Sequence, residues 1–311
     1  MGLDFRDAVF NGVGEIVRSN PNAVVLTNDM GAMGLDAIRA EFPERAINVG
    51  IAEQNMVSVA GGLALSGKSV FVYGIIPHVT GRCFEQIKLD ICVPNLPVTI
   101  LGVGAGLAYG VDGPTHHGVE DIAIMRVLGN MSIYNPADGV SAFAAVHLAH
   151  RSGGPGYIRM DKEVLPALYD PDQDFSEGMG ILAEGADAII VSTGVQSWTA
   201  REAARSLATI GISTGVIDLF RLKPVNVRGL AAALAGVPAV VTLEENVAAG
   251  GLGSIVAEIL AEYGLRPRLR RLSLGDRFLL GSAPREWAAE KCGLTGSHVV
   301  EAVRDLLVGR S

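Results

Sequence analysis

Apolar and polar positions follow two alternating periods along the chain, one typical of buried strands and one typical of helices. In the first half, short apolar runs predict strands at residues 23–27, 69–73, 97–101, 131–134 and 157–160. Apolar residues spaced three or four apart predict helices between them at residues 5–18, 52–66, 83–91, 120–128 and 136–150. In the last of these helices, Asn135 is expected to be the N-cap and Pro136 the first helical residue. This alternation predicts a parallel sheet covered by helices on both faces.

A second series of strands and helices follows residues 166–184, which combine prolines, glycines and clustered acidic residues and are therefore expected to form a linker. Strands are predicted at residues 188–192, 213–218, 239–243 and 268–272. Helices are predicted near residues 197–209, 227–234, 253–263, 284–291 and 297–307. We therefore predict an α/β chain of two doubly wound domains, residues 1–165 and 185–311.

Composition and charge exclude several classes of protein. Apolar residues make up 49% of the 311 residues and charged residues 19%, as in ordinary globular chains. The 25 basic and 33 acidic residues give a net charge of −8, which argues against a nucleic-acid or anionic-membrane surface. Cys83, Cys92 and Cys292 lack any CxxC spacing, which favours reduced thiols. Because we also find no apolar signal region and no run of 18 apolar residues, we expect a cytoplasmic protein.

One candidate for chemistry is Glu53, in the stretch of residues 48–56. Residues 46–49 are predicted to end a buried strand, Gly50 to form the turn, and Glu53 to lie in the first turn of the next helix. Open α/β sheets bind ligands at this carboxyl end of their strands. The helix amino-terminus favours the ionised carboxylate, whereas burial favours the protonated form. Glu53 is therefore suited to proton transfer, although a simple helix cap explains the same position.

The glycine-rich stretch at residues 102–110 looks like a dinucleotide-binding fingerprint, but its context does not fit. The residues that follow, 112–117, predict a turn and not a helix, and no acidic residue closes a second strand about twenty residues later. A nicotinamide site is therefore not expected here.

Five motifs in one order resemble those of the transketolase family. Gly50-Ile-Ala-Glu-Gln-Asn-Met56 resembles the pyrimidine-domain motif of transketolases and is similar to that of 1-deoxyxylulose-5-phosphate synthases. The further matches are Arg82-Cys-Phe-Glu-Gln-Ile87, Asp112-Gly-Pro-Thr-His116, Glu120-Asp121, and Leu243-Glu-Glu-Asn with Gly250-Gly-Leu-Gly253. The resemblance implies a thiamine-diphosphate pyrimidine-binding domain followed by a transketolase C-terminal domain, in which Glu244 and Glu245 are expected to be structural.

The resemblance also implies roles for particular residues. Glu53, as a catalytic residue, would hydrogen-bond the aminopyrimidine of thiamine diphosphate, and His116 would stabilise charge on the reacting sugar. The expected cofactor-binding residues are Glu53, Asp29, Met30, Ile76, His78, Val79 and Arg82. The expected substrate-binding residues are Asp112, His116, His117 and Arg159. Two alternatives stay open: Asp29 as a turn residue, and Arg159 in a surface ion pair with Asp161.

The chain departs from the family pattern at three positions. Ile76 and Val79 replace the phenylalanines that stack on the aminopyrimidine, which leaves His78 as a possible stacking ring. Gly104 replaces a phosphate-binding histidine. We therefore expect a sugar outside the common pentose-phosphate set.

A family motif is also missing. We find no Gly-Asp-Gly motif, which in full-length transketolases helps to hold Mg²⁺ and the diphosphate. The resemblance then implies one subunit of a split enzyme that transfers a two-carbon ketol unit from a ketose to an aldose. An amino-terminal partner would supply the metal ligands, this chain would supply none, and two copies of each would form a self-associating α2β2 assembly.

Other functions remain open at this stage. A 1-deoxyxylulose-5-phosphate synthase-like enzyme or a 2-oxoacid dehydrogenase β-subunit shares the expected architecture. A regulatory paralogue without activity is the alternative outside the enzymes, and intact Glu53, Asp112 and His116 argue against it.

Overall fold

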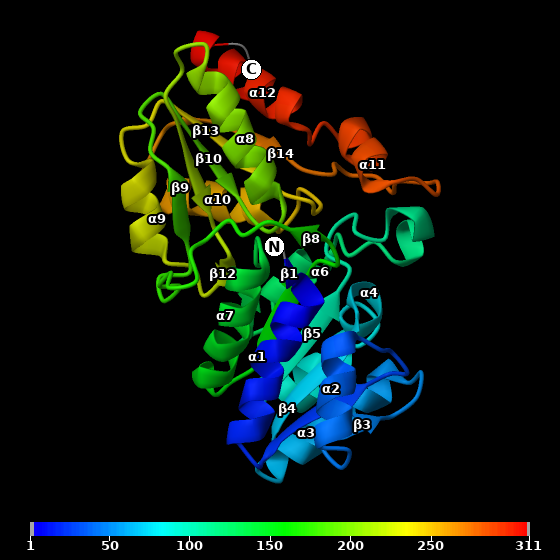
Figure 1. Cartoon of the computed structure of the whole chain (residues 1–311). Helices are drawn as coiled ribbons and strands as arrows, with labels where there is room; N and C mark the ends of the chain where they lie inside the picture. Colours follow the sequence, from blue (N-terminus) through cyan, green and yellow to red (C-terminus); the bar gives the residue numbers. More distant parts are fainter. Residues whose placement is uncertain (1–2, 310–311) are drawn as a thin grey trace.

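The computed structural model describes residues 3–309, which form two sheets with helices on both faces (Figure 1). The predicted architecture of two doubly wound α/β units is confirmed. A short antiparallel pair, β1 (Leu3–Asp4) with β8 (Val164–Leu165), lies where the two units meet.

The first sheet has seven strands in the order β12-β6-β7-β5-β4-β2-β3, and all of its pairs are parallel except β12 with β6. Its strands are β2 (Ala23–Thr27), β3 (Ala46–Asn48), β4 (Ser69–Ile75), β5 (Val98–Val103), β6 (Ser132–Tyr134), β7 (Gly156–Met160) and β12 (Arg221–Lys223). Because the central strands are buried on both faces, they appear in the sequence as continuous apolar runs.

Two helical layers cover this sheet. One face packs against α1 (Phe5–Ser19), α2 (Met33–Glu41) and α7 (Gly139–Ser152). The other face packs against α3 (Glu53–Leu65), a π-helical turn (Ile87–Cys92) and α6 (Asp121–Arg126). Shorter helical turns, α4 (Ile76–Val79), α5 (Phe84–Gln86) and a 3₁₀ segment (Gly110–Thr115), follow the carboxyl ends of β4 and β5.

The second sheet has five strands in the order β14-β13-β10-β11-β9. Its strands are β9 (Gly180–Ala183), β10 (Ala188–Ser192), β11 (Thr214–Asp218), β13 (Ala239–Leu243) and β14 (Arg268–Leu272), and only β9 runs antiparallel. Its helices are α8 (Gln196–Ala208), α9 (Val227–Leu234), α10 (Leu252–Glu262), α11 (Arg285–Cys292) and α12 (Gly296–Val308). Apolar side chains of α9 and α10 join the cluster beneath α3 and α6, so one core extends across both units.

The structure corrects the expected boundary between the units. Strand β9 lies inside residues 166–184, which were predicted to be a linker. Strand β12 comes from the second series of elements, yet it pairs with β6 of the first sheet. The two sheets therefore do not divide at a single point of the sequence.

Two local predictions were also wrong. Strand β3 is an edge strand, and Ile47 and Asn48 are exposed instead of buried. Helix α7 begins at Gly139 and not at Pro136, because Asp138 adopts an extended backbone and forms a capping box with Ser141. Asn135 is buried instead, where it donates to Thr193 Oγ1 at 3.1 Å.

None of the helices between residues 3 and 309 combines the length and apolarity needed to cross a membrane.

The Asp138 carboxylate joins helix α7 to the chain that leads into the second unit. It accepts hydrogen bonds from the backbone N–H groups of Ser141 at 2.8 Å, Leu168 at 2.6 Å and Tyr169 at 3.0 Å. We expect Asp138→Ala to lower the free energy of unfolding by roughly 2–4 kcal/mol, since it removes a cap and leaves buried donors unpaired. Urea denaturation would measure this change.

The matched control is Asp174→Ala, because Asp174 accepts from the Ser176 N–H at 2.8 Å but is exposed. This control is expected to cost much less than Asp138→Ala, because water replaces the lost hydrogen bond at an exposed site. Equal losses for the two variants would contradict the role given to Asp138.

Candidate active site

Glu53 is the first residue of α3, and it follows the turn at Gly50, whose φ is +77°. Its side chain is 4% exposed. Asn28 Nδ2 donates to Glu53 Oε1 at 2.8 Å, and Arg82 Nη1 donates to Oε2 at 2.8 Å. Burial alone would raise the pKa of Glu53, but its own backbone N–H, Asn28 and Arg82 outweigh burial and lower that pKa. The structure therefore holds an ionised carboxylate in a nearly buried position.

One buried polar atom beside Glu53 has no hydrogen-bond partner among the described residues. It is Asn28 Oδ1, at the carboxyl end of β2. A Cβ at Gly74 would lie 3.3 Å from this oxygen and would collide with Val79, so glycine permits the close packing there. An unpaired buried acceptor next to an ionised carboxylate suits a ligand that presents an N–H donor and a ring nitrogen that can take up a proton. An aminopyrimidine has both groups, so these residues fit that part of thiamine diphosphate.

One histidine ring lies next to this carboxylate, and a second histidine contacts the first. His78 of α4 lies with its Nδ1 4.0 Å from Glu53 Oε1, and its ring meets His116 edge to face at a centroid distance of 5.4 Å. Burial, and then the charge of Arg82, lower the pKa of His78, which favours its neutral form. Tyr109 also contacts His116, at a centroid distance of 5.9 Å. The loop that carries Asp112 and His116 therefore reaches the Glu53 site.

The expectation that Ile76 and Val79 face the cofactor is not met in this structure. Both side chains are 0% exposed. Ile76 packs against the backbone of Gly102 and Gly118, where any Cβ would come within 2.8 Å of it. The partly exposed ring at this position is His78.

Asp29 and Met30 lie at the same edge of the sheet, after β2. Asp29 has a φ of +64° and exchanges hydrogen bonds with Asn48, whose Nδ2 donates to Asp29 Oδ1 at 3.1 Å. In return the Asp29 N–H donates to Asn48 Oδ1 at 2.9 Å. This fits the turn interpretation of Asp29, and the exposed carboxylate leaves the cofactor role a prediction.

Arg159 does not form the surface ion pair with Asp161 that was considered. It is 3% exposed, and its Nε donates to Asp121 Oδ2 at 2.8 Å. Its Nη2 donates to the carbonyl oxygens of Gly118 and Glu245. A guanidinium engaged in this way lends no support to direct phosphate binding.

His117 lies apart from the Glu53 site. It is 5% exposed, and its Nε2 has no partner among the described residues. It lines a cavity of about 600 Å³ together with Glu120 and with Arg271 and Leu274 of the second unit. Its expected contact with the substrate therefore remains a prediction.

Within residues 3–309, we find no group of three or more His, Cys, Asp or Glu side chains placed to hold a metal ion. Sequence reasoning also missed Asn28 and Tyr109. A polar residue that ends a buried strand was the available signal for Asn28, whereas nothing local identified Tyr109.

Two family profiles match the chain. The one described as "Transketolase, pyrimidine binding domain" matches residues 1–167. The one described as "Transketolase, C-terminal domain" matches residues 178–299.

Several curated proteins are similar to the chain. It is 33% identical over 267 residues to a subunit of apulose-4-phosphate transketolase from Actinobacillus succinogenes, with 86% of each chain covered. It is 33% identical over 304 residues to the 6-deoxy-6-sulfo-D-fructose transketolase subunit SqwH of Clostridium sp. (strain MSTE9), with 97% of this chain and 94% of that one covered. It is 34% identical to 1-deoxy-D-xylulose-5-phosphate synthase 1 of Geobacter sulfurreducens, of which it spans 47%.

Solved structures share the fold. A split gene transketolase, solved as an inactive beta4 tetramer, superposes over the whole of both chains with 38% identity and a TM-score of 0.89. Transketolase from Campylobacter jejuni superposes with a TM-score of 0.81 at 19% identity, and this chain covers 47% of it.

The contacts of Arg82 lead to a prediction about Glu53. We expect Arg82→Gln to raise the pKa of Glu53. The variant removes the positive charge that lowers this pKa, whereas burial, which raises it, is unchanged. Carbon-13 NMR titration of the side-chain carboxylates would measure this pKa, with Glu53→Gln identifying the signal. The control is Arg205→Gln, which breaks the exposed pair of Arg205 with Glu202 on α8 and should leave that pKa unchanged. An unchanged pKa in Arg82→Gln would refute this account of the site.

Proposed function

Because this chain belongs to the transketolase family, we propose that it is the subunit of a two-component transketolase that carries the pyrimidine-binding domain. In this proposal, it acts with a separate amino-terminal subunit to transfer a two-carbon ketol unit from a ketose to an aldose. The observation that carries the proposal is the buried, ionised Glu53 beside the unpaired acceptor of Asn28.

Thiamine diphosphate, when bound, supplies the chemistry that breaks and forms a carbon–carbon bond next to a carbonyl group. Glu53 would hydrogen-bond the ring nitrogen of its aminopyrimidine and hold the proton there. Asn28 Oδ1 would accept a hydrogen bond from the amino group of that ring, which gives this oxygen the partner that it lacks. His78 would lie against the ring in place of the buried Ile76 and Val79.

The loop next to this site would bind the sugar. Asp112 is exposed and would accept hydrogen bonds from sugar hydroxyl groups. His116, which contacts both His78 and Tyr109, would hydrogen-bond the oxygen on which negative charge develops.

The substrate would differ from the common pentose phosphates. Gly104 has a φ of +97°, and a Cβ at this position would collide with the ring of Tyr109. A histidine, or any other side chain, at position 104 would therefore require Tyr109 to move. The relatives that are named for apulose 4-phosphate and for 6-deoxy-6-sulfo-D-fructose support a sugar outside that common set.

The proposal includes an assembly and a compartment. The partner subunit would hold Mg²⁺ and the diphosphate, and two copies of each subunit would form the enzyme, in which this chain also contacts its own copy. Cys83, Cys92 and Cys292 are free thiols, as expected in a reducing, cytoplasmic compartment.

The second candidate is a 1-deoxyxylulose-5-phosphate synthase-like activity, favoured by the 34% identity to such an enzyme and by two adjacent histidines at positions 116 and 117. Pyruvate decarboxylation in place of ketose cleavage would identify it. A 2-oxoacid dehydrogenase β-subunit would also consume an oxoacid, and a regulatory paralogue would bind the partner without turnover.

Reconstitution tests the proposal. We expect isothermal titration to detect thiamine diphosphate and Mg²⁺ binding when this chain is mixed with the amino-terminal subunit, and not with either alone. The mixture should cleave a ketose and pass the two-carbon unit to an aldose. Tight binding to this chain alone, or decarboxylation without ketose cleavage, would contradict the proposal.

Glu53→Gln gives the sharper test in the same mixture. It should lower turnover by about 10²–10⁴-fold, because the amide cannot hold the proton, with little change in the thermal midpoint of unfolding. The control is Glu85→Gln, at an exposed carboxylate on α5, which should keep full activity. Full activity in Glu53→Gln would rule out the proposed role.

A further inference from the structure

The loop that carries Asp112 and His116 leaves the first sheet and returns to it at one point. The Gly106 N–H donates to the Gly118 carbonyl oxygen at 2.8 Å, and both Ala105 and Gly106 form β-bridges with Gly118. Residues 107–117 are therefore a closed loop, and the placement of its two ends determines where His116 lies.

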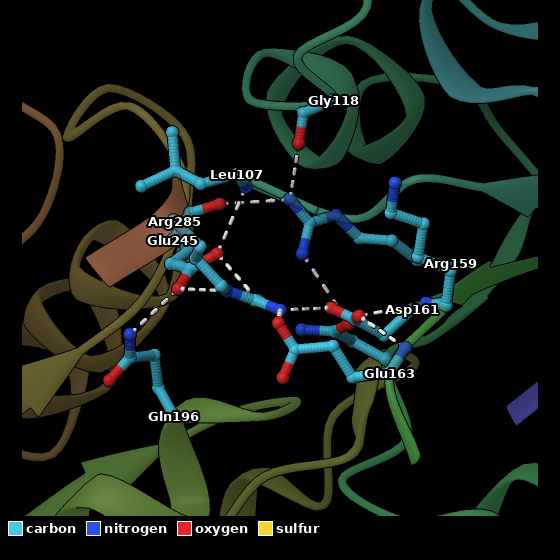
Figure 2. A network of polar contacts seen from close by, with 10 residues as sticks. Leu107, Gly118, Arg159, Asp161, Glu163, Gln196, Glu245 and Arg285 are labelled. Atoms are coloured by element: carbon cyan, nitrogen blue, oxygen red, sulfur yellow. Dashed lines mark hydrogen bonds and ion pairs between the residues drawn. The ribbon is translucent and has the colours of Figure 1, made fainter. Parts of the chain in front are cut away.

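A residue of the second unit holds both ends of this loop (Figure 2). Glu245, just after β13, accepts from the Leu107 N–H on its Oε2 at 3.0 Å. Its backbone oxygen accepts from Arg159 Nη2 at 2.9 Å, and the same Nη2 also donates to Gly118. One end of the loop is thus bound directly by Glu245, and the other is bound through Arg159.

Arg285, at the start of α11, fixes the Glu245 carboxylate from the opposite side. Its Nε lies 2.9 Å from Oε1 and its Nη2 lies 2.7 Å from Oε2, a two-point pairing of guanidinium with carboxylate. Its Nη1 contacts Asp161 Oδ2 at 2.9 Å and Glu163 Oε1 at 2.8 Å (Figure 2). Gln196 Nε2 also donates to Glu245 Oε1 at 2.8 Å.

The Glu245 carboxylate is closely packed against the start of the loop. A Cβ at Gly106 would collide with the Glu245 side chain, so glycine is required where the two units approach. The segment that leads to Arg285 also contacts the tip of the loop. Ser282 Oγ donates to the Val111 carbonyl oxygen at 2.6 Å.

We propose that Glu245 and Arg285 are positioning residues of the second unit, which place His116 for the reaction by holding the loop of residues 107–117. This inference rests on the proposed function, because it assumes that His116 contacts the substrate. Neither residue is assigned a contact with substrate or cofactor. Their effect would arise because a reacting group displaced by about 1 Å can cost about 10²-fold in rate.

A double-mutant cycle in the complex with the amino-terminal subunit tests this inference. Glu245→Gln keeps the shape but weakens the pairing with Arg285, and it should lower kcat/KM by about 10-fold or more while cofactor affinity stays within about 3-fold. In a His116→Ala background, the same change should cost less than about 3-fold, because the group that it positions is gone. Equal losses in both backgrounds would mean a general structural role and would overturn the inference.

Gly106→Ala is the second variant, since it displaces the Glu245 carboxylate while all charges remain. It should show the same loss of kcat/KM and the same dependence on His116, so a failure of Glu245→Gln to fold leaves the inference testable. The control is Arg205→Gln, which breaks the exposed pair of Arg205 with Glu202 on α8 and should keep full activity.

The two proposals fail in different ways. If the unmodified complex does not transfer a ketol unit, the proposed function is wrong. If it does, and Glu245→Gln and Gly106→Ala both retain full activity, only the positioning role is wrong.

Discussion

The need to pair buried charges determines how the two units of this protein fit together. Arg285 and Glu245 lie almost entirely inside the chain, as do Arg159 and Asp121. An unpaired charge in such a place would cost several kcal/mol, so each guanidinium must meet its carboxylate. Arg285 also pairs with Asp161 of the first unit, and Arg159 of the first unit donates to the Glu245 carbonyl oxygen, so these contacts hold the two sheets in place. The loop with His116 is placed by the same contacts.

The candidate active site is left partly unpaired. Glu53 remains ionised in a nearly buried position because Asn28 and Arg82 donate to it. The side-chain oxygen of Asn28, Oδ1, has no hydrogen-bond partner in the described part of the chain. Natural proteins commonly concentrate such exceptions where a ligand binds.

The solved relatives show how far this fold is shared. The fold extends over the full length of a split gene transketolase at 38% identity, and over part of longer transketolases at about 20% identity. In this chain, the lining of the site is set by local packing. Ile76 is fully buried, and the ring of Tyr109 occupies the space beside Gly104. Function on a shared fold depends on such local substitutions, so the sugar cannot be inferred from the fold alone.

The sequence by itself determined the central strands of both sheets, because strands buried on two faces appear as continuous apolar runs. It also indicated Glu53 and the His116 loop, because both follow strand ends in motifs of a known family. Only the tertiary structure decided that β12 joins the first sheet, that Arg159 pairs with Asp121, and that Glu245 binds Leu107. Local patterns report burial and turns, whereas these contacts join residues far apart in the chain. Tertiary packing determines these contacts, and the spacing of apolar residues along the chain does not indicate them.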